Sequence, residues 1–303
     1  MDIPFHAGEL EIQERTGEQQ MAIANGRIIR DSIMSGAIPF LEAQPTVIAG
    51  SVDANGDLWT SMLMGEPGFI EVEDPHILWI LREGLVESTA GIIFDTLKDG
   101  GPLGLLFMDP VKRLRFRING QATVTDQGIQ IQVGEAYGNC PKYIQKRSLE
   151  REINASPIAR EEGKTLRREL TEWITGADTF FVSSSDGGQR VDASHRGGNP
   201  GFVQVLPDGT LKIPDYQGNS MFNTLGNLAQ HPKAGLLFVD FQRGATLQLT
   251  GTTELEFDHR SPEDMQRTTG TGRYWLFRPT RWIVVRGHHS GKWGVPEYSP
   301  YNP

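Results

Sequence analysis

Short apolar or alternating runs, separated by glycine-rich turns, occupy most of the chain. Residues 45–63 hold an apolar run, an Asp-Ala-Asn-Gly turn and a second apolar run, which is the order of a β-hairpin. Residues 179–195 repeat this order with an Asp-Gly-Gly turn. Apolar and polar residues alternate strictly over 245–250, which is typical of a half-buried strand in a curved sheet. The pattern therefore predicts a mainly β (α+β) fold.

Further strands and a few helices complete the predicted elements. The strands are 68–72, 77–80, 104–109, 113–120 and 130–136 in the first half, and 201–205, 211–214, 235–241, 245–251 and 254–257 in the second. Many short strands joined by Gly-rich turns favour a small barrel. The helices are an N-terminal helix from Glu14 to Ser35, a connecting helix from Glu150 to Thr175 and a short helix from Asn223 to Gln230. The Pro-rich tail, 290–303, is expected to be irregular.

The two halves are copies of one module. Residues 45–80 align without gaps on 178–213, and 11 of the 36 positions are identical, including the pattern Ser-x-x-x-Gly-x-Pro-Gly-Phe in both copies. A second block, 104–109, matches 235–240. Because the blocks occur in the same order at nearly equal offsets, 133 and 131 residues, we infer a tandem duplication of a module of about 100 residues.

Composition narrows the class of protein. The 303 residues include 29 Lys and Arg against 38 Asp and Glu, a net charge of -9, which argues against a general binder of nucleic acid or anionic membranes. A single cysteine excludes an internal disulfide and suits a reducing cytosol. The N-terminal residues lack the basic start and apolar core of a signal peptide, and no run approaches the ~18–20 apolar residues of a membrane helix. We therefore expect a soluble, cytoplasmic protein.

The copies differ at one strand in a way that indicates chemistry. Residues 59–65 read Trp-Thr-Ser-Met-Leu-Met-Gly, whereas the matching residues 192–198 read Asp-Ala-Ser-His-Arg-Gly-Gly. Ser194, His195 and Arg196 offer a hydroxyl, an imidazole and a guanidinium beside flexible glycines. Such a set can hold a phosphate through charge-assisted hydrogen bonds. The alternative is a polar strand end on the surface.

A second polar segment follows in the same copy. Residues 214–219 read Pro-Asp-Tyr-Gln-Gly-Asn and precede Asn223, Thr224 and Asn227 on the short helix. Amides and a tyrosine can bind the edge of a polar heterocycle, and a helix start attracts phosphate. The alternative is that Asn219 and Asn223 only cap the helix.

The first copy contributes three arginines. Arg113, Arg115 and Arg117 alternate along a strand, which would project all three from one face, and the polar segment 137–145 follows. Three like charges on one face suggest a nearby anion, such as a cofactor phosphate, or carboxylates across an interface. The alternative is pairing with the surplus acidic residues of the chain.

Other reaction classes fit less well. Cys140 has no C-x-x-C partner and is expected to be a buried structural thiol. His288 and His289 would project to opposite sides of a strand without a third ligand nearby, so no metal site is expected. The chain contains no G-x-G-x-x-G opening a helix, no Walker sequence and no G-x-S-x-G elbow. A cofactor is therefore the expected source of reactivity.

The sequence resembles the FMN-binding split barrels of the pyridoxamine 5'-phosphate oxidase-like superfamily. From Asp178 to Phe257 the resemblance is carried by the paired strands, the strand end 192–196, PDYQGN, the short helix and GLLFVDF. More narrowly, PFHAGELEIQERTG, RLRFRING, YGNCPKYIQ and SHRGGNPGF resemble a bacterial subfamily of uncharacterised oxidase-like flavoproteins. The similarity spans nearly the whole chain, and YGNCPKYIQ and SHRGG are its most specific parts.

This resemblance implies two tandem split β-barrels that form an intramolecular pseudo-dimer, with one FMN between them. The implied parts are an N-terminal arm and helix (1–36), a degenerate barrel 1 (37–147), a connecting helix (148–176), an FMN-binding barrel 2 (177–290) and a tail (291–303). The implied cofactor-binding residues are Arg190, Asp192, Ser194, His195, Arg196, Tyr216, Asn219, Asn223 and Thr224 from barrel 2, with Arg115, Arg117, Lys142 and Tyr143 from the other side.

The function implied is that of an FMN-dependent oxidoreductase acting on an unknown small molecule. His195 is the best candidate for a catalytic group, because the unperturbed pKa of histidine lies near neutrality. Pyridoxamine phosphate is not the expected substrate, since residues 273–282 match the Arg- and Trp-bearing end of the true oxidases only loosely. A non-enzymatic flavin- or haem-binding module and an F420-dependent reductase are the alternatives on the same fold. A homodimer is left open, and neither nucleic acid nor a membrane is an expected partner.

Overall fold

The computed structural model describes residues 4–86, 93–95, 97, 101–151, 158–287 and 291–303. His288 and His289, whose place on a strand was predicted, lie outside the described residues.

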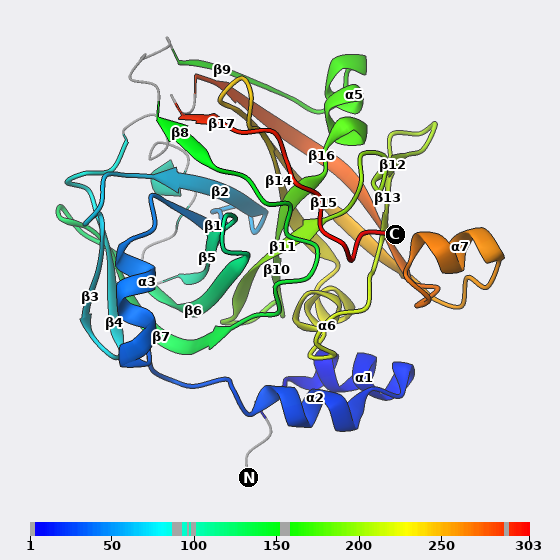
Figure 1. Ribbon diagram of the computed structural model, residues 1–303, viewed down its shortest axis with the longest axis horizontal. Helices are drawn as coiled ribbons and strands as arrows, with labels where there is room; N and C mark the ends of the chain where they lie inside the picture. The colour runs from blue at the N-terminus through cyan, green and yellow to red at the C-terminus, as the bar shows by residue number, and fades with distance from the viewer. Residues whose placement is uncertain (1–3, 87–92, 96, 98–100, 152–157, 288–290) are drawn as a thin grey trace.

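Two antiparallel sheets with the same strand order dominate the fold (Figure 1). The first runs β2-β1-β5-β6-β7-β4-β3, and the second runs β11-β10-β14-β15-β16-β13-β12 with β9 added beside β16. The first sheet consists of β1 (Thr46–Val52), β2 (Leu58–Met64), β3 (Ile70–Asp74), β4 (Ile77–Leu81), β5 (Pro102–Asp109), β6 (Leu114–Val124) and β7 (Gly128–Gly138). The second consists of β9 (Ala159–Gly163), β10 (Thr179–Ser185), β11 (Val191–Gly197), β12 (Gln204–Val205), β13 (Leu211–Pro214), β14 (Lys233–Asp240), β15 (Ala245–Glu256) and β16 (Tyr274–Arg286).

The two sheets are repeats of one another. Strands β1 and β2 begin 133 residues before β10 and β11, while β5 and β6 begin 131 residues before β14 and β15. These are the two offsets found in the sequence, and each strand keeps its place in the order of its sheet. The predicted mainly β fold with two tandem copies of one barrel is therefore confirmed.

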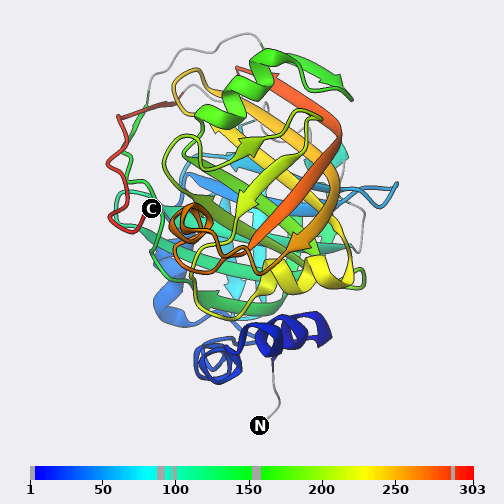
Figure 2. The same ribbon diagram turned by 90° about the vertical axis from the view of Figure 1, so that its right-hand side faces the viewer.

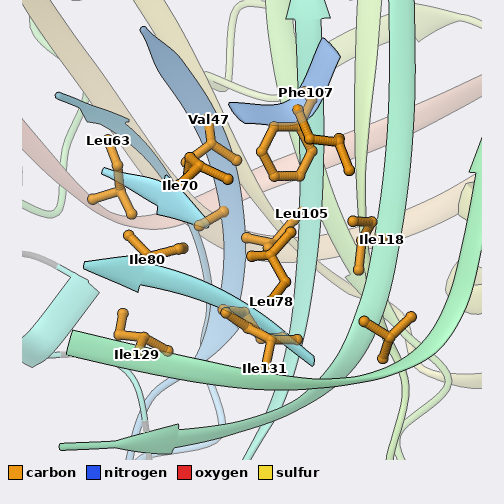
Figure 3. Packing of buried hydrophobic residues seen from close by; sticks show 14 of the residues in the cluster. Val47, Leu63, Ile70, Leu78, Ile80, Leu105, Phe107, Ile118, Ile129 and Ile131 are labelled. Carbon is orange, nitrogen blue, oxygen red and sulfur yellow. The ribbon is translucent and has the colours of Figure 1, made fainter. Parts of the chain in front are cut away.

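Each sheet curls around its own apolar core. In the first, Leu63 on β2 and Ile70 on β3 belong to one buried cluster, although these strands are at opposite ends of the strand order. Figure 3 shows Val47, Leu105 and Ile131, from three further strands, directed into the same core. The end strands thus meet through side chains around a shared core, as expected of a split barrel.

The outer faces of the two barrels pack against each other about a pseudo-twofold axis. A Cβ added at Gly104 of β5 would lie 2.7 Å from the carbonyl oxygen of Val191 on β11. At the matching position of β14, a Cβ on Gly235 would lie 2.6 Å from the carbonyl oxygen of Leu58 on β2. Because only glycine permits this approach of two backbones, both copies need it at the same place. The predicted intramolecular pseudo-dimer is confirmed.

Hydrogen bonds between the barrels explain one departure from the sequence pattern. The alternation over 245–250 predicts a strand with one exposed face, yet Thr246, Gln248 and Thr250 are each only 1% exposed. Gln248 Nε2 donates to Thr60 O at 2.6 Å and to Ser61 Oγ at 2.9 Å in the first barrel. The polar face of β15 is therefore covered by the other barrel.

The helices differ most from the predictions. The expected N-terminal helix from Glu14 to Ser35 is two helices, α1 (Ala7–Thr16) and α2 (Gln19–Gly26), separated at Gly17, whose φ of 71° ends α1. Within the expected connecting helix from Glu150 to Thr175, the described residues form β8 (Leu149–Arg151), β9 and then α5 (Arg168–Gly176), so only the last part is helical. The mixed charges that indicated a helix instead pair across strands, since Glu162 of β9 accepts from Arg281 of β16 at 2.6 Å. Residues 152–157 of that prediction lie outside the described residues.

The short elements that remain lie at the edges of the barrels. They are the 3-10 helix η1 (Ser35–Ala37), α3 (Ile38–Glu42), α6 (Asn223–Gln230), α7 (Pro262–Arg267) and β17 (Gly291–Trp293). Helix α6 has the predicted bounds, whereas the tail, predicted to be irregular, begins with β17 paired to β8. Figure 2 shows α1 and α2 beneath α6. Among the described residues, the helices are too short and too polar to cross a membrane.

Candidate functional site

A cavity of about 110 Å³ lies where the two barrels meet. The first barrel supplies β6 and residues 139–143, while the second supplies the end of β11, the loop 215–222 and the start of α6. Eleven of the thirteen cofactor-binding residues implied by the sequence line it: Arg115, Arg117, Lys142, Tyr143, Ser194, His195, Arg196, Tyr216, Asn219, Asn223 and Thr224. Segments up to 110 residues apart in the chain, from Arg115 to Leu225, therefore form one site.

Arg117 is the centre of a network of hydrogen bonds in the lining of the cavity. Its Nε lies 2.9 Å from Asp192 Oδ1, its Nη1 donates to Tyr137 Oη at 2.8 Å and to Asn223 Oδ1 at 3.0 Å, and its Nη2 donates to Ser194 Oγ. Burial opposes the charge on Arg117, but Asp192 and Tyr137 raise its pKa above the usual value. Nearly every donor of this guanidinium is used within the protein, so its role is to hold Ser194 and Asn223 in place.

Arg115 and Arg196 are different, because among the described residues neither has a carboxylate within ion-pair distance. Arg115 Nε donates to Cys140 O at 2.6 Å, and Arg196 Nη1 donates only to the carbonyl oxygen of His195, at 3.2 Å. Burial, Arg117 and Arg196 lower the pKa of Arg115 to about 9. Burial also lowers the pKa of Arg196, although Asp215 opposes the shift. Both side chains are partly buried, and adjacent cations without carboxylate counter-ions in such a place form a favourable site for an anion.

The start of α6 adds to the positive potential of the cavity. Asn223, Thr224 and Leu225, the first residues of this helix, line it, and no side chain caps the helix at Phe222. Free backbone N–H groups and the helix dipole both favour an anion there. The alternative role expected for Asn223, capping, is therefore not what the structure has: its side chain bonds Arg117 and Glu9.

Three lining residues have unusual backbone conformations. Tyr143, Ser220 and Phe222 have φ values of 65°, 62° and 61°, in the left-handed region that non-glycine residues seldom adopt. Such strain is maintained by surrounding contacts and is concentrated at functional sites. The ring centroids of Tyr143 and Tyr216, which both line the cavity, are 4.9 Å apart, and Tyr143 Oη donates to Gln217 O at 3.0 Å.

His195 is almost fully buried, at 3% exposure. Its Nδ1 lies 3.4 Å from Arg115 Nη1, and its ring meets Phe181 edge-on at 5.7 Å. Burial together with Arg115, Arg196 and Arg147 holds the pKa of His195 well below its ordinary value. The reason for predicting a catalytic role, a pKa near neutrality, therefore does not hold, because the ring is neutral at physiological pH.

Some of the highlighted residues lie outside the cavity. Arg190 precedes β11, and its side chain is 50% exposed and lies 3.5 Å from Glu135. Asp192 is buried below the lining as the partner of Arg117. Arg113 was expected on the face of Arg115 and Arg117, but it precedes β6 with a φ of 52° and donates to Glu297 Oε1 at 3.1 Å. Cys140, expected to be buried, is partly exposed and lines the cavity.

The structure adds residues that the sequence did not indicate. Glu9 of α1 is 3% exposed, and its Oε1 accepts from Asn223 Nδ2 at 2.5 Å. The carbonyl oxygen of Asn219 accepts from Asn25 Nδ2 at 2.7 Å, so the N-terminal helices also hold the loop 215–222. A glycine pair is the only local signal of this docking: a Cβ on Gly8 would lie 2.2 Å from the carbonyl oxygen of Gly226.

The pseudo-symmetric position in barrel 1 lacks this chemistry. Arg115 and Arg117 are replaced by Thr246 and Gln248 at the matching positions of β15, and His195 is replaced by Met62 on β2. The bond from Gln248 to Ser61 occupies the place of the bond from Arg117 to Ser194. The two positions therefore share this side-chain hydrogen bond, but the position in barrel 1 has no arginine.

The comparisons with known proteins concern the fold. No family model and no curated protein matches the chain. Solved structures that resemble it include a Clostridium acetobutylicum protein related to general stress protein 26 of B. subtilis (pyridoxinephosphate oxidase family), at 14% identity over 42% of this chain and 91% of that one, with a TM-score of 0.30. A Nostoc punctiforme pyridoxamine 5'-phosphate oxidase-related, FMN-binding protein matches at 11% identity over 45% and 91%, with a TM-score of 0.28. The haem storage protein HutZ of Vibrio cholerae matches at 12% identity over 44% and 96%, with a TM-score of 0.26.

These structures include members of the superfamily that the sequence resembles.

Proposed function

We propose that the cavity between the barrels binds FMN, with the phosphate held by Arg115, Arg196 and the start of α6. The observation that supports this most strongly is the pair of partly buried guanidinium groups without carboxylate partners among the described residues. An anion there would relieve their mutual repulsion, whereas a neutral ligand would not. Lys142, whose Nζ lies 5.5 Å from the centroid of the Tyr301 ring, also lines the cavity and is a third cation available to the ligand.

At about 110 Å³ the cavity is smaller than pockets that enclose a whole cofactor, so we expect it to hold the phosphate end and the part of the flavin that the remaining lining contacts. Tyr143 and Tyr216 provide aromatic surface, and Asn219 and Thr224 provide polar groups for the edge of a ring system. Arg117, Ser194 and Asn223 are held by one another and would keep the cavity in shape before a ligand arrives. The substituted residues in the pseudo-symmetric position support one flavin per chain.

The activity that follows is that of an FMN-dependent oxidoreductase acting on a small molecule. A bound flavin supplies hydride or single-electron transfer, and the protein contributes binding, orientation and charge. With its neutral ring, His195 serves to orient Arg115 and is a poor proton donor at neutral pH. A non-enzymatic flavin- or haem-binding module and an F420-dependent reductase remain the competing functions for the same fold.

Ligand identification on the purified protein tests this proposal. The protein should be yellow, and mass spectrometry after denaturation should identify FMN. Arg196→Ala should weaken FMN binding by about 10–100-fold, the usual contribution of one charged hydrogen bond. Arg190→Ala removes an exposed arginine six residues away in the sequence that does not line the cavity, and should leave FMN binding unchanged.

Other outcomes decide among the alternatives. Colourless protein that takes up no added FMN would refute the proposal. A Soret band on haem titration would favour the haem-binding module, and turnover of F420 without retained FMN would favour the reductase. Equal loss of FMN in the two arginine variants would show that the phosphate is not held in the cavity.

A further inference from the structure

A second, smaller cavity lies between the barrels on the other side of His195. It has a volume of about 30 Å³, and most of its wall is apolar, formed by side chains such as Ile48, Met62, Leu106 and Phe181. His195 lines both this inner cavity and the candidate cofactor cavity. The imidazole ring of His195 therefore separates the inner cavity from the candidate cofactor cavity.

Three polar side chains of the inner cavity lack hydrogen-bond partners among the described residues. They are His195 at Nε2, Thr179 at Oγ1 and Trp293 at Nε1, and their residues are 3%, 3% and 7% exposed. Native proteins pair nearly all such buried groups, with protein atoms or with ordered water. Three unpaired groups around one small cavity therefore indicate a ligand.

The sheet brings two of these groups within reach of one small molecule. In the ladder of β10 and β11, Thr179 is opposite Gly197 and Phe181 is opposite His195. Thr179 and His195 are therefore diagonal neighbours on one face of the sheet, with Cα atoms roughly 7–8 Å apart. Since neither His195 Nε2 nor Thr179 Oγ1 has a hydrogen-bond partner among the described residues, the two atoms do not bond each other directly, and side chains at this spacing suit a single bridging molecule.

The chemistry of the three groups defines that molecule as a hydrogen-bond acceptor. Arg115 can only donate, so His195 Nδ1 must accept from it and the ring proton lies on Nε2. Trp293 Nε1 is also only a donor, while the hydroxyl of Thr179 can donate or accept. A water molecule can accept two bonds and donate a third, and the cavity exceeds the ~10–15 Å³ that one water requires.

We propose that the inner cavity binds one water molecule that bridges His195 Nε2, Trp293 Nε1 and Thr179 Oγ1, which makes His195 a positioning residue for Arg115. With its proton fixed on Nε2, the ring presents Nδ1 to Arg115 and leaves the other donors of that guanidinium for an anion. This last consequence rests on the proposed phosphate site. The water site itself stands on the three unpaired groups and the cavity alone.

A crystal structure at high resolution tests the water directly. A peak should appear about 2.7–3.2 Å from His195 Nε2 and from at least one of the other two atoms. An empty cavity would overturn the proposal. After a bromide soak, an anomalous peak at that position would also overturn it, because the site would then belong to a small anion.

A matched pair of threonine variants tests the same bridge in solution. Thr179→Val keeps the shape of the side chain but removes one partner of the water, so it should lower the urea midpoint of unfolding. Thr253→Val is the control, because Thr253 is also buried with an unpartnered hydroxyl among the described residues and lines neither cavity. A midpoint for Thr179→Val that equals or exceeds that of the control would contradict the bridge.

The consequence for His195 has its own measurement. In ¹⁵N NMR spectra, His195 should be in the single Nε2–H tautomer that Arg115 requires, and Thr179→Val should shift the Nε2 resonance because the water that accepts from it loses a partner. The same variant should weaken FMN binding several-fold through Arg115. If the water and the tautomer are found but FMN does not bind, the proposed function fails and the water site stands. If FMN binds and the inner cavity is empty, the water site fails and the proposed function stands.

Discussion

The buried carboxyl of Glu9 gives the fold a pH dependence that can be calculated from the structure. Glu9 Oε1 accepts from Asn223 Nδ2 at 2.5 Å, and Oε2 accepts from the backbone N–H of His6 at 2.9 Å. Burial nevertheless raises the pKa of Glu9 to about 8, and nearby Glu135 and Asp192 also raise it. The ordinary pKa of a glutamate, 4.5, applies to Glu9 when it is exposed in the unfolded chain. The perturbation that tests this is Glu9→Gln, which keeps the shape and cannot ionise.

The sign and size of the effect follow from proton linkage. Between pH 4.5 and about 8 the native state keeps a proton that the unfolded state has lost, so the free energy of unfolding falls as pH rises. With about 1.36 kcal/mol for each unit, the difference of about 3.5 units gives a loss of at most about 5 kcal/mol across this window. Above pH 8 both states are ionised and the loss is complete. In Glu9→Gln, which cannot ionise, the free energy of unfolding should not fall with pH in this way.

Urea unfolding followed by circular dichroism at pH 5, 6, 7, 8 and 9 measures the difference. The stability of Glu9→Gln relative to the unaltered protein should rise steadily from pH 5 to pH 8 and then stay constant. Glu11→Gln, on the exposed side of α1, controls for the change in net charge. A difference that is independent of pH, or one that falls as pH rises, would refute the claim that Glu9 is protonated in the native state.

Three further variants test the scaffold of the site. Arg117→Met leaves Asp192 buried without its partner and should destabilise the protein by about 3–5 kcal/mol in urea unfolding; a loss below about 1 kcal/mol would contradict the central place of this ion pair. Gly104→Ala places a Cβ 2.7 Å from the backbone of Val191 and should lower the free energy of unfolding by about 1–3 kcal/mol, because the barrels must move apart. In the control, Gly36→Ala, the added Cβ meets nothing within 4 Å and stability should not change. Equal effects of the two variants would argue against the barrel interface. Gly226→Ala, with a Cβ 2.6 Å from the backbone nitrogen of Glu9, should release α1 from α6, seen as faster proteolysis of the N-terminal helices, and unchanged proteolysis would contradict that packing.

The fold was predictable because the signals that define it are repeated. The two offsets in the sequence are the offsets of the strands, and the equivalent glycines Gly104 and Gly235 mark the interface of the two barrels. The helices were predicted less well, because each prediction depended on the residue pattern of a single segment that is not repeated in the chain. The charges of β9 fit an exposed helix as well as an edge strand, and the pairing of β9 with β16, which brings Glu162 to Arg281, distinguishes the two.

The site was predictable where residues share a strand end and not where distant segments meet. Ser194, His195 and Arg196 follow one another on β11 and line the cavity, while Arg190, which directly precedes the same strand, is half-exposed beside Glu135. Glu9 could not be found, since its meeting with Asn223 joins residues 214 apart. The pKa of His195 could not be foreseen either, because it depends on burial and on arginines from elsewhere in the chain.

The central claim is that a cationic cavity between two copies of one barrel holds a phosphate. Titration of the ligand-free protein with FMN and with riboflavin, which differ only in that phosphate, tests it most directly. FMN should bind about 100-fold or more tightly, equivalent to about 3 kcal/mol, because Arg115, Arg196 and the start of α6 have no anion to bind in riboflavin. Equal affinities for the two flavins would contradict the account.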